Sequence, residues 1–218
     1  MSKIDINKKQ KRDSLLNSAL LLFNENGFHQ TSISDISKKA GVAKGTFYLY
    51  FKDKFDLRNK LISHQAARTF TEAYRALDPT QIPELEDQLI FLIDQILNQF
   101  RDNPQMMYFL AKHLSWAVFT DALKEAASST DKYMDNQASE AFNELVHRLD
   151  TRYEDPELLI YLILEFTAST SYNVILYEQP VTLEELKPRI FDVTRYMIRR
   201  SEKSSIAPAE QNNSEARE

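Results

Sequence analysis

Residues 31–54, which read TSISDISKKAGVAKGTFYLYFKDK, decide the fold of this chain. They contain Gly41 and Gly45, and the third glycine of the chain, Gly27, lies just upstream. Glycine permits backbone conformations that a Cβ atom forbids, and it lets another surface approach the main chain closely. Because no glycine occurs elsewhere in the sequence, special backbone geometry is needed in this part of the chain only.

A helix is expected just before this segment, from about Lys9 to Asn26. Leu15, Ala19 and Phe23 recur at the spacing of one helical face. Gly27 then supplies the C-terminal stop.

The segment itself predicts two further helices. The second opens at Ser32–Asp35, which has the pattern of a capping box with Asp in place of the longer Glu. Gly41 and Val42 make a turn, and a third helix runs from Lys44 to about Phe51. Two short helices joined by a tight turn are typical of a helix-turn-helix DNA-binding unit.

The third helix has two different faces. On a helical wheel Phe47, Tyr50 and Phe51 point to one side, where they can pack on the preceding helices. The other side carries Lys44, Gly45, Tyr48 and Leu49. A cation, a bare backbone position and a phenol suit a surface that enters the major groove.

The rest of the chain also has helical spacing, and the prolines, which begin at Pro79, punctuate it. We therefore predict an all-α protein of about nine helices. A connecting helix should span roughly Lys54–Leu77, and the later helices are expected at Glu84–Asp102, Pro104–Ala127, Asp131–Leu149, Pro156–Tyr177 and Leu183–Arg200, the last broken or restarted at Pro188.

Charge is divided unevenly along the chain. Residues 1–62 carry twelve Lys and Arg against six Asp and Glu, whereas residues 63–218 carry fifteen against twenty-six. A basic N-terminal part suits a polyanion, and phosphate would repel the acidic remainder.

Composition argues against several classes of protein. The chain has no Cys, no glycine-rich phosphate loop and no secretory signal, and Glu165 interrupts its longest apolar run. We therefore expect a cytoplasmic protein that is not an enzyme and has no cofactor or membrane association. None of the histidines pairs at metal-binding helical spacing: His29, His64, His113 and His147.

Residues 31–54 closely resemble the N-terminal domain of the tetracycline-repressor (TetR) family, and the match extends over roughly residues 10–62. The resemblance implies a homodimer, formed through the last two helices, that places two recognition helices in successive major grooves of a palindromic or near-palindromic operator. A small hydrophobic effector in the C-terminal domain would release the DNA. The implied domains are 1–53 for DNA binding and 54–200 for ligand binding and dimerisation, followed by a disordered tail at 201–218.

The resemblance also implies a set of DNA contacts. Lys44 and Lys54 could neutralise phosphates, and Leu49 could meet a thymine methyl group, although it could equally be an isolated exposed leucine. Tyr50 is open between DNA contact and core packing. Ala43 departs from the family, which usually has a capping residue there. The full candidate set is Ser32, Ile33, Ser34, Lys44, Gly45, Thr46, Tyr48, Leu49, Tyr50 and Lys54.

For an effector cavity, aromatic, methionine and isolated polar residues of the C-terminal part are candidates. Each could instead be ordinary core or face solvent. The candidates are Phe91, Asp94, Met107, Phe109, His113, Trp116, Tyr161, Glu165 and Asn173. The alternative function is a DNA-binding protein of the same fold without an effector, with an architectural or protein-recruiting role.

Overall fold

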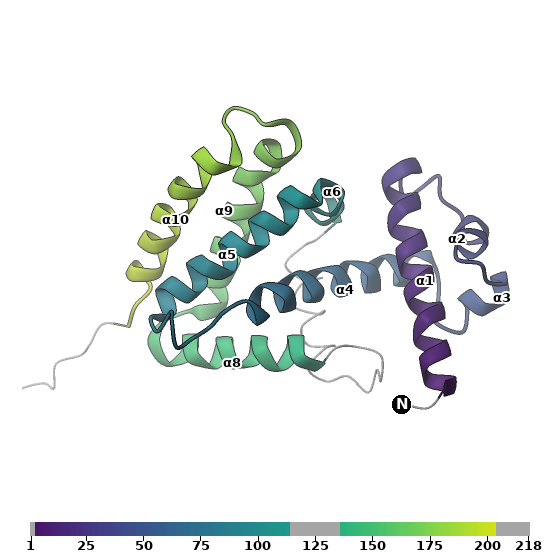
Figure 1. The fold of residues 1–218 in the computed structure, drawn as a ribbon, viewed down its shortest axis with the longest axis horizontal. Coiled ribbons are helices and arrows are strands. Elements are labelled where there is room, and N and C mark those ends of the chain that lie inside the picture. Colours follow the sequence, from purple (N-terminus) through teal and green to yellow (C-terminus); the bar gives the residue numbers. More distant parts are fainter. Residues whose placement is uncertain (1–2, 114–135, 204–218) are drawn as a thin grey trace, which may run out of the picture.

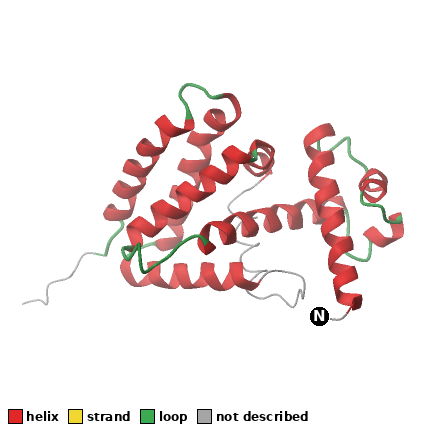
Figure 2. Cartoon of the chain, viewed as in Figure 1, coloured by secondary structure: helices red, strands yellow, loops and turns green. Residues whose placement is uncertain are grey.

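The computed structural model describes residues 3–113 and 136–203. Within these ranges the chain forms nine helices and no strand, and the only β-type contact is an isolated bridge between Tyr153 and Glu202 (Figure 2). The predicted all-α fold is confirmed.

Three helices form the N-terminal part, which we call the head: α1 (Lys3–Asn26), α2 (Ile33–Lys39) and α3 (Lys44–Phe47) (Figure 1). Gly27 and Gly41 have φ angles of 80° and 70°, in the left-handed region that favours glycine. They end α1 and α2, as predicted.

The long helix α4 (Lys54–Arg75) leads from the head into the rest of the chain, which we call the body (Figure 1). Among the described residues, the body contains five helices. These are α5 (Leu85–Asp102), α6 (Pro104–His113), α8 (Asn136–Arg152), α9 (Pro156–Tyr177) and α10 (Leu183–Arg200).

Two clusters of buried apolar side chains hold these parts together. The head cluster contains residues of α1, α2 and α3, but it also takes in Leu57 and Leu61 of α4 and Phe109 of α6. The second cluster joins α4, α5, α8, α9 and α10. Because α4 and α6 touch the head, its orientation depends on how the body is packed.

Ion pairs fix α10 on α5. Arg195 reaches both Glu86 and Asp87 at 2.7 Å, and Arg199 reaches Glu86 at 2.9 Å. The Arg199 hydrogen bond, helped by Arg195, holds the pKa of Glu86 below its usual value against the opposing effect of burial. Further along, the ammonium group of buried Lys187 lies 2.9 Å from Asp94.

Several predicted helix boundaries differ from the structure, including the end of α8, which lies at Arg152 instead of Leu149. The first helix begins at Lys3 instead of Lys9, and the third ends at Phe47 instead of Phe51. The last helix continues through Pro188, because a capping box formed by Thr182 and Glu185 and a buried stripe on both sides of the proline hold it together. The predicted ends near residues 127 and 131, and the tail beyond residue 203, lie outside the described residues.

The helix α9 has apolar side chains on nearly every face, as predicted, yet one side of it is exposed. Leu158 and Leu162 are 50% and 44% exposed, and α10 exposes Val193 and Tyr196. By length and composition alone α9 could cross a membrane despite Glu165, but the core helix of a soluble protein passes the same test.

Candidate DNA-binding site

The start of α2 is rigidly built. The Ser32 hydroxyl accepts a hydrogen bond from the backbone N–H of Asp35, and the Asp35 carboxylate accepts one from the backbone N–H of Ser32 at 3.1 Å, which completes the predicted capping box. The Ser32 hydroxyl also donates to the Asp35 carboxylate at 2.6 Å, and this bond, together with that from the Ser32 backbone N–H, holds the pKa of Asp35 below its usual value. Ser32 and Ser34 are exposed, and Ile33 is half-buried against the head cluster.

Residues 44–51, which follow the turn at Gly41 and Val42, are anchored on their inner side by aromatic side chains. Phe47 and Phe51 are fully buried, and their ring centroids lie 5.5 Å apart. Tyr50 is half-buried and packs against the same cluster. These three residues keep the backbone of the segment in place from the inner side.

The outer side of this segment is open. Tyr48 is 54% exposed and Leu49 is 79% exposed, and Lys44 and Gly45 are exposed beside them. The predicted division into two faces is therefore confirmed. A Cβ atom at Gly45 would meet nothing within 4 Å, so the protein itself does not require a glycine there.

The N-terminus of α3 lacks a side-chain cap. Ala43 makes no capping hydrogen bond, and the half-buried Thr46 donates its backbone N–H to the Ala43 carbonyl at 2.8 Å. The first backbone N–H groups of this helix therefore have no side-chain acceptor from Ala43. Such groups are well suited to a phosphate oxygen.

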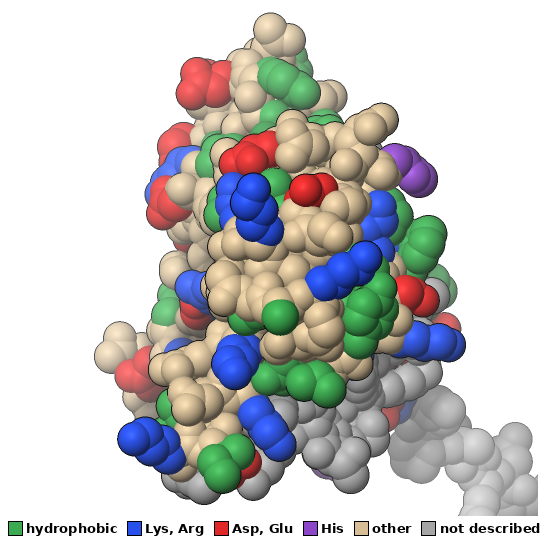
Figure 3. All heavy atoms as spheres, turned by 90° about the vertical axis from the view of Figure 1, so that its right-hand side faces the viewer, with side chains coloured by type: hydrophobic (Ala, Val, Ile, Leu, Met, Phe, Trp, Pro, Cys, Tyr) green, Lys and Arg blue, Asp and Glu red, His purple; other side chains and the backbone are tan. Residues whose placement is uncertain are grey.

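The face that carries these residues is mixed in chemistry. Figure 3 shows Lys and Arg side chains over its middle and lower parts, next to exposed hydrophobic side chains. The exposed lysines around the helix-turn-helix are Lys38, Lys39, Lys44 and Lys52.

The role predicted for Lys54 needs correction. Its ammonium group donates to the carbonyl oxygens of Phe28 and Thr31 at 2.7 and 2.8 Å, and it lies 4.5 Å from the centroid of the Phe28 ring. A third carbonyl, that of His29, is 3.4 Å away. Lys54 therefore holds the turn that precedes α2, because its donors are directed inward and not toward a ligand.

Sequence reasoning missed a second group of cations. The early start of α1 makes a helical extension in which all residues up to Lys11 except Asp5 are exposed. The first buried residue of α1 is Arg12. The signal was present in the sequence as a concentration of basic residues: Lys3, Lys8, Lys9 and Lys11.

Among the described residues, those predicted for an effector cavity lie in different surroundings. Glu165 and Asn173 are exposed on α9, because each lies two positions, about 200° around the helix, beyond the buried residues Ile163 and Ser171. Asp94 is paired with Lys187.

The other predicted cavity residues are dispersed. Met107 and Phe109 are buried in α6, with Phe109 in the head cluster, whereas Phe91 and Tyr161 are half-buried on α5 and α9. The side chain of His113 and all of Trp116 lie outside the described residues.

Comparisons with known proteins agree with this picture. The family model for bacterial regulatory proteins of the tetR family matches residues 15–61. The fatty acid metabolism regulator protein of Bacillus subtilis is 48% identical over 50 residues, which are 23% of this chain and 26% of that protein. The transcriptional regulator AcrR of Shigella flexneri is 42% identical over 53 residues, 24% of this chain and 25% of AcrR. The chain spans about half or less of the length of the curated relatives it matches.

Solved structures share the fold over most of the chain. A TetR-family regulator from Shewanella sp. PV-4 superimposes with a TM-score of 0.66 at 19% identity, covering 88% of this chain and 98% of the other. FadR from Bacillus subtilis, in complex with stearoyl-CoA, gives 0.57 at 20% identity, covering 83% and 96%. Residues 15–61 therefore carry the DNA-binding domain of the tetR family of bacterial regulatory proteins, and the described part of the chain has the fold of TetR-family regulators.

Proposed function

We propose that this regulator is a cytoplasmic homodimeric repressor that binds a palindromic or near-palindromic operator and leaves it when a small hydrophobic effector binds the body. One observation carries the proposal: the segment after the turn is fixed by fully buried Phe47 and Phe51 while Tyr48 and Leu49 remain exposed. A surface that is held rigidly and left largely open to solvent is suited to an external partner.

The chemistry of this surface favours DNA as the partner. Lys44 can neutralise a phosphate, the Tyr48 hydroxyl can donate a hydrogen bond, and Gly45 lets the backbone approach closely. Leu49 can contact a thymine methyl group in the major groove. Ser32 and Ser34 lie at the N-terminus of α2, where a phosphate is favoured.

The exposed apolar side chains of α9 and α10 support dimerisation. Leu158, Leu162, Val193 and Tyr196 together leave an apolar surface on the last two helices. A symmetric dimer buries the same patch of both copies and would present two recognition segments to two half-sites.

Effector release has support from a structural neighbour. FadR from Bacillus subtilis is described in complex with stearoyl-CoA, and it shares the fold of this chain. A protein of this fold can therefore hold a ligand that carries a long apolar chain. The alternative, a DNA-binding protein with a permanently filled body, predicts no ligand response.

Operator binding can be tested by fluorescence anisotropy with the DNA that flanks the protein's own gene. Tyr48→Ala should weaken binding about tenfold, which corresponds to about 1.4 kcal/mol. The matched control is Tyr177→Ala, since Tyr177 is similarly exposed, at 60%, on the body. Equal affinities of the two variants, or binding that is insensitive to salt, would contradict the proposal.

Dimerisation can be tested with a matched pair of leucines. Leu162 and Leu21 are both 44% exposed, on α9 and α1. In sedimentation experiments Leu162→Glu should shift the protein to monomer, whereas Leu21→Glu should not.

A repressor with an effector can be distinguished from a DNA-binding protein without one by screening hydrophobic compounds. Each compound is tested for thermal stabilisation of the protein and for release of bound DNA. A compound that does both supports the repressor. If compounds that stabilise the protein leave DNA binding unchanged, the alternative without an effector is favoured.

A further inference from the structure

We propose that the junction between head and body is a separate ligand site, which takes an anionic amphiphile: an apolar ring system or chain that carries one carboxylate, sulfonate or phosphate group. Of the described residues predicted for the effector cavity, only Phe109 borders this site. Ligand binding here does not depend on the proposed operator binding.

Two hollows adjoin at this junction. The first, of about 350 Å³, lies between the end of α1, the start of α6 and the end of α9. The second, of about 300 Å³, lies between the end of α1, the turn after it, Arg58 of α4 and α6. Asn24 and Tyr108 line both hollows. Each hollow is at the lower end of the size range of small-molecule pockets.

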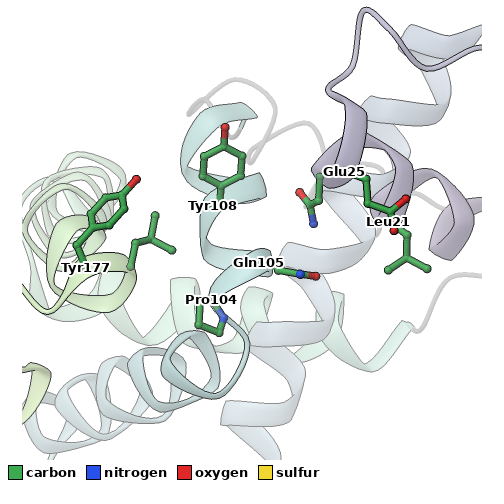
Figure 4. Close-up of a pocket in the computed structure, with 8 residues that line it drawn as sticks. Leu21, Glu25, Pro104, Gln105, Tyr108 and Tyr177 are labelled. Carbon is green, nitrogen blue, oxygen red and sulfur yellow. The ribbon is translucent and has the colours of Figure 1, made fainter.

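The first hollow offers apolar surface. Leu21, Tyr108 and Tyr177 border it and are 44%, 36% and 60% exposed. Figure 4 shows Tyr108 of α6 between Leu21 of α1 and Tyr177 of α9. An apolar ligand body placed here would cover side chains that water now reaches.

The second hollow offers positive charge and hydrogen-bond donors. The Arg58 guanidinium lies 4.8 Å from the centroid of the Phe28 ring and 5.5 Å from that of Phe55, and it forms no ion pair within the described part of the chain. Among the residues that the structure describes, it donates hydrogen bonds only to the neighbouring amide oxygen of Asn59, at 3.3 and 3.4 Å. Exposed His29 lies in the same wall.

A buried donor lies where the hollows adjoin. The Asn24 side-chain nitrogen is shielded from solvent and has no hydrogen-bond partner among the described residues. A buried donor without an acceptor is unfavourable, so the Asn24 amide would be stabilised if it turned toward a ligand oxygen in either hollow.

The charges of the two hollows set the orientation of the ligand. Glu25 lies at the first hollow and is paired with Lys39 at 3.5 Å. Its carboxylate disfavours an anion there, whereas Arg58 favours one at the second hollow. We therefore place the anionic group near Arg58 and the apolar body near Tyr108 and Tyr177.

The experiment uses the full chain without DNA and the probe 1-anilinonaphthalene-8-sulfonate, an aromatic amphiphile with one sulfonate, followed by fluorescence titration. Arg58→Gln should raise the Kd of this probe about tenfold, because a charge-assisted interaction is removed. Gln105→Trp, which fills the first hollow from an exposed position, should abolish saturable binding. The matched control Arg68→Gln, on the same helix and 60% exposed, should leave the Kd unchanged.

The uncharged probe N-phenyl-1-naphthylamine separates charge recognition from general apolar binding. Its Kd should not change in Arg58→Gln but should rise in Gln105→Trp. The proposal is overturned if the anionic probe does not bind, if neither variant changes its Kd, or if Arg58→Gln affects both probes equally. Should Arg58→Gln lose its helical circular dichroism, Gln105→Trp alone decides. Because no DNA is present, failure here leaves the operator proposal intact.

Discussion

Replacing Asp94 by Ala should destabilise the protein more than replacing its partner Lys187 by Met, although both changes remove the same ion pair. The Lys187 side chain is 9% exposed and that of Asp94 is 31% exposed. Loss of Asp94 leaves a buried ammonium group with only the Asn98 amide oxygen at 2.6 Å and the Glu184 carboxylate at 3.5 Å. Loss of Lys187 leaves a carboxylate that water reaches and to which Asn98 donates at 3.1 Å.

The magnitudes follow from this difference in burial. Removing one partner of a fully buried ion pair costs about 3–5 kcal/mol. Because Asp94 is about a third exposed and Asn98 remains, we expect about 2 kcal/mol for Asp94→Ala. Methionine fills a volume similar to that of lysine, so Lys187→Met should cost less than about 1 kcal/mol.

Urea denaturation at equal protomer concentration measures both free energies of unfolding, and a thermal scan of Asp94→Ala should show a Tm about 4–8 °C lower. Glu184→Ala is the control, since this third partner is 67% exposed and should contribute less than about 0.5 kcal/mol. Equal costs for the two partners, or a larger cost for Lys187→Met, would refute the reasoning from burial.

Three further predictions concern the DNA-binding part. Gly45→Ala should leave thermal stability unchanged or slightly higher, because its Cβ atom meets nothing within 4 Å, yet anisotropy should show weaker operator binding. Asp35→Ala should lower the Tm at neutral pH, and the difference from the unchanged protein should vanish in acid. The pKa of Asp35 is lower in the folded than in the unfolded protein. The Asp35 carboxylate therefore stabilises the fold above its unfolded-state pKa, and this stabilisation is lost as the pH falls through its folded-state pKa. Replacing Lys8, Lys9 and Lys11 of the α1 extension together by glutamine should reduce the salt dependence of operator binding. The slope of the logarithm of the binding constant against the logarithm of the salt concentration should fall by about 0.9 for each phosphate that the protein no longer neutralises. An unchanged slope would exclude phosphate binding by these lysines.

Local patterns in the sequence predicted most of the helices. The bounds Pro156–Tyr177 and Leu183–Arg200 are those of α9 and α10, because proline and apolar spacing mark these helices. The start of α1 was missed because its first residues have no apolar stripe to reveal them. The third helix is shorter than expected because, after Phe47, the backbone turns tightly, with the Tyr50 N–H donating to the Phe47 carbonyl at 3.0 Å.

The exposed side of residues 44–51 was also predictable, since exposure within one short segment follows from helical periodicity. The role of Lys54 was not, because it depends on carbonyl groups of a turn more than twenty residues earlier. The pairing of Asp94 with Lys187 likewise joins two helices, α5 and α10, that are far apart in the sequence. A sequence pattern marks a charge in apolar surroundings, but it does not identify the partner.

The separation between anchoring and exposed side chains bears on how this protein could evolve. Leu49 is 79% exposed and Tyr48 is 54% exposed, whereas Phe47 and Phe51 maintain the packing beneath them. Mutations at the two outer positions therefore carry little folding penalty. After gene duplication, a copy could acquire preference for a new promoter through these positions while its thermodynamic stability remained nearly constant.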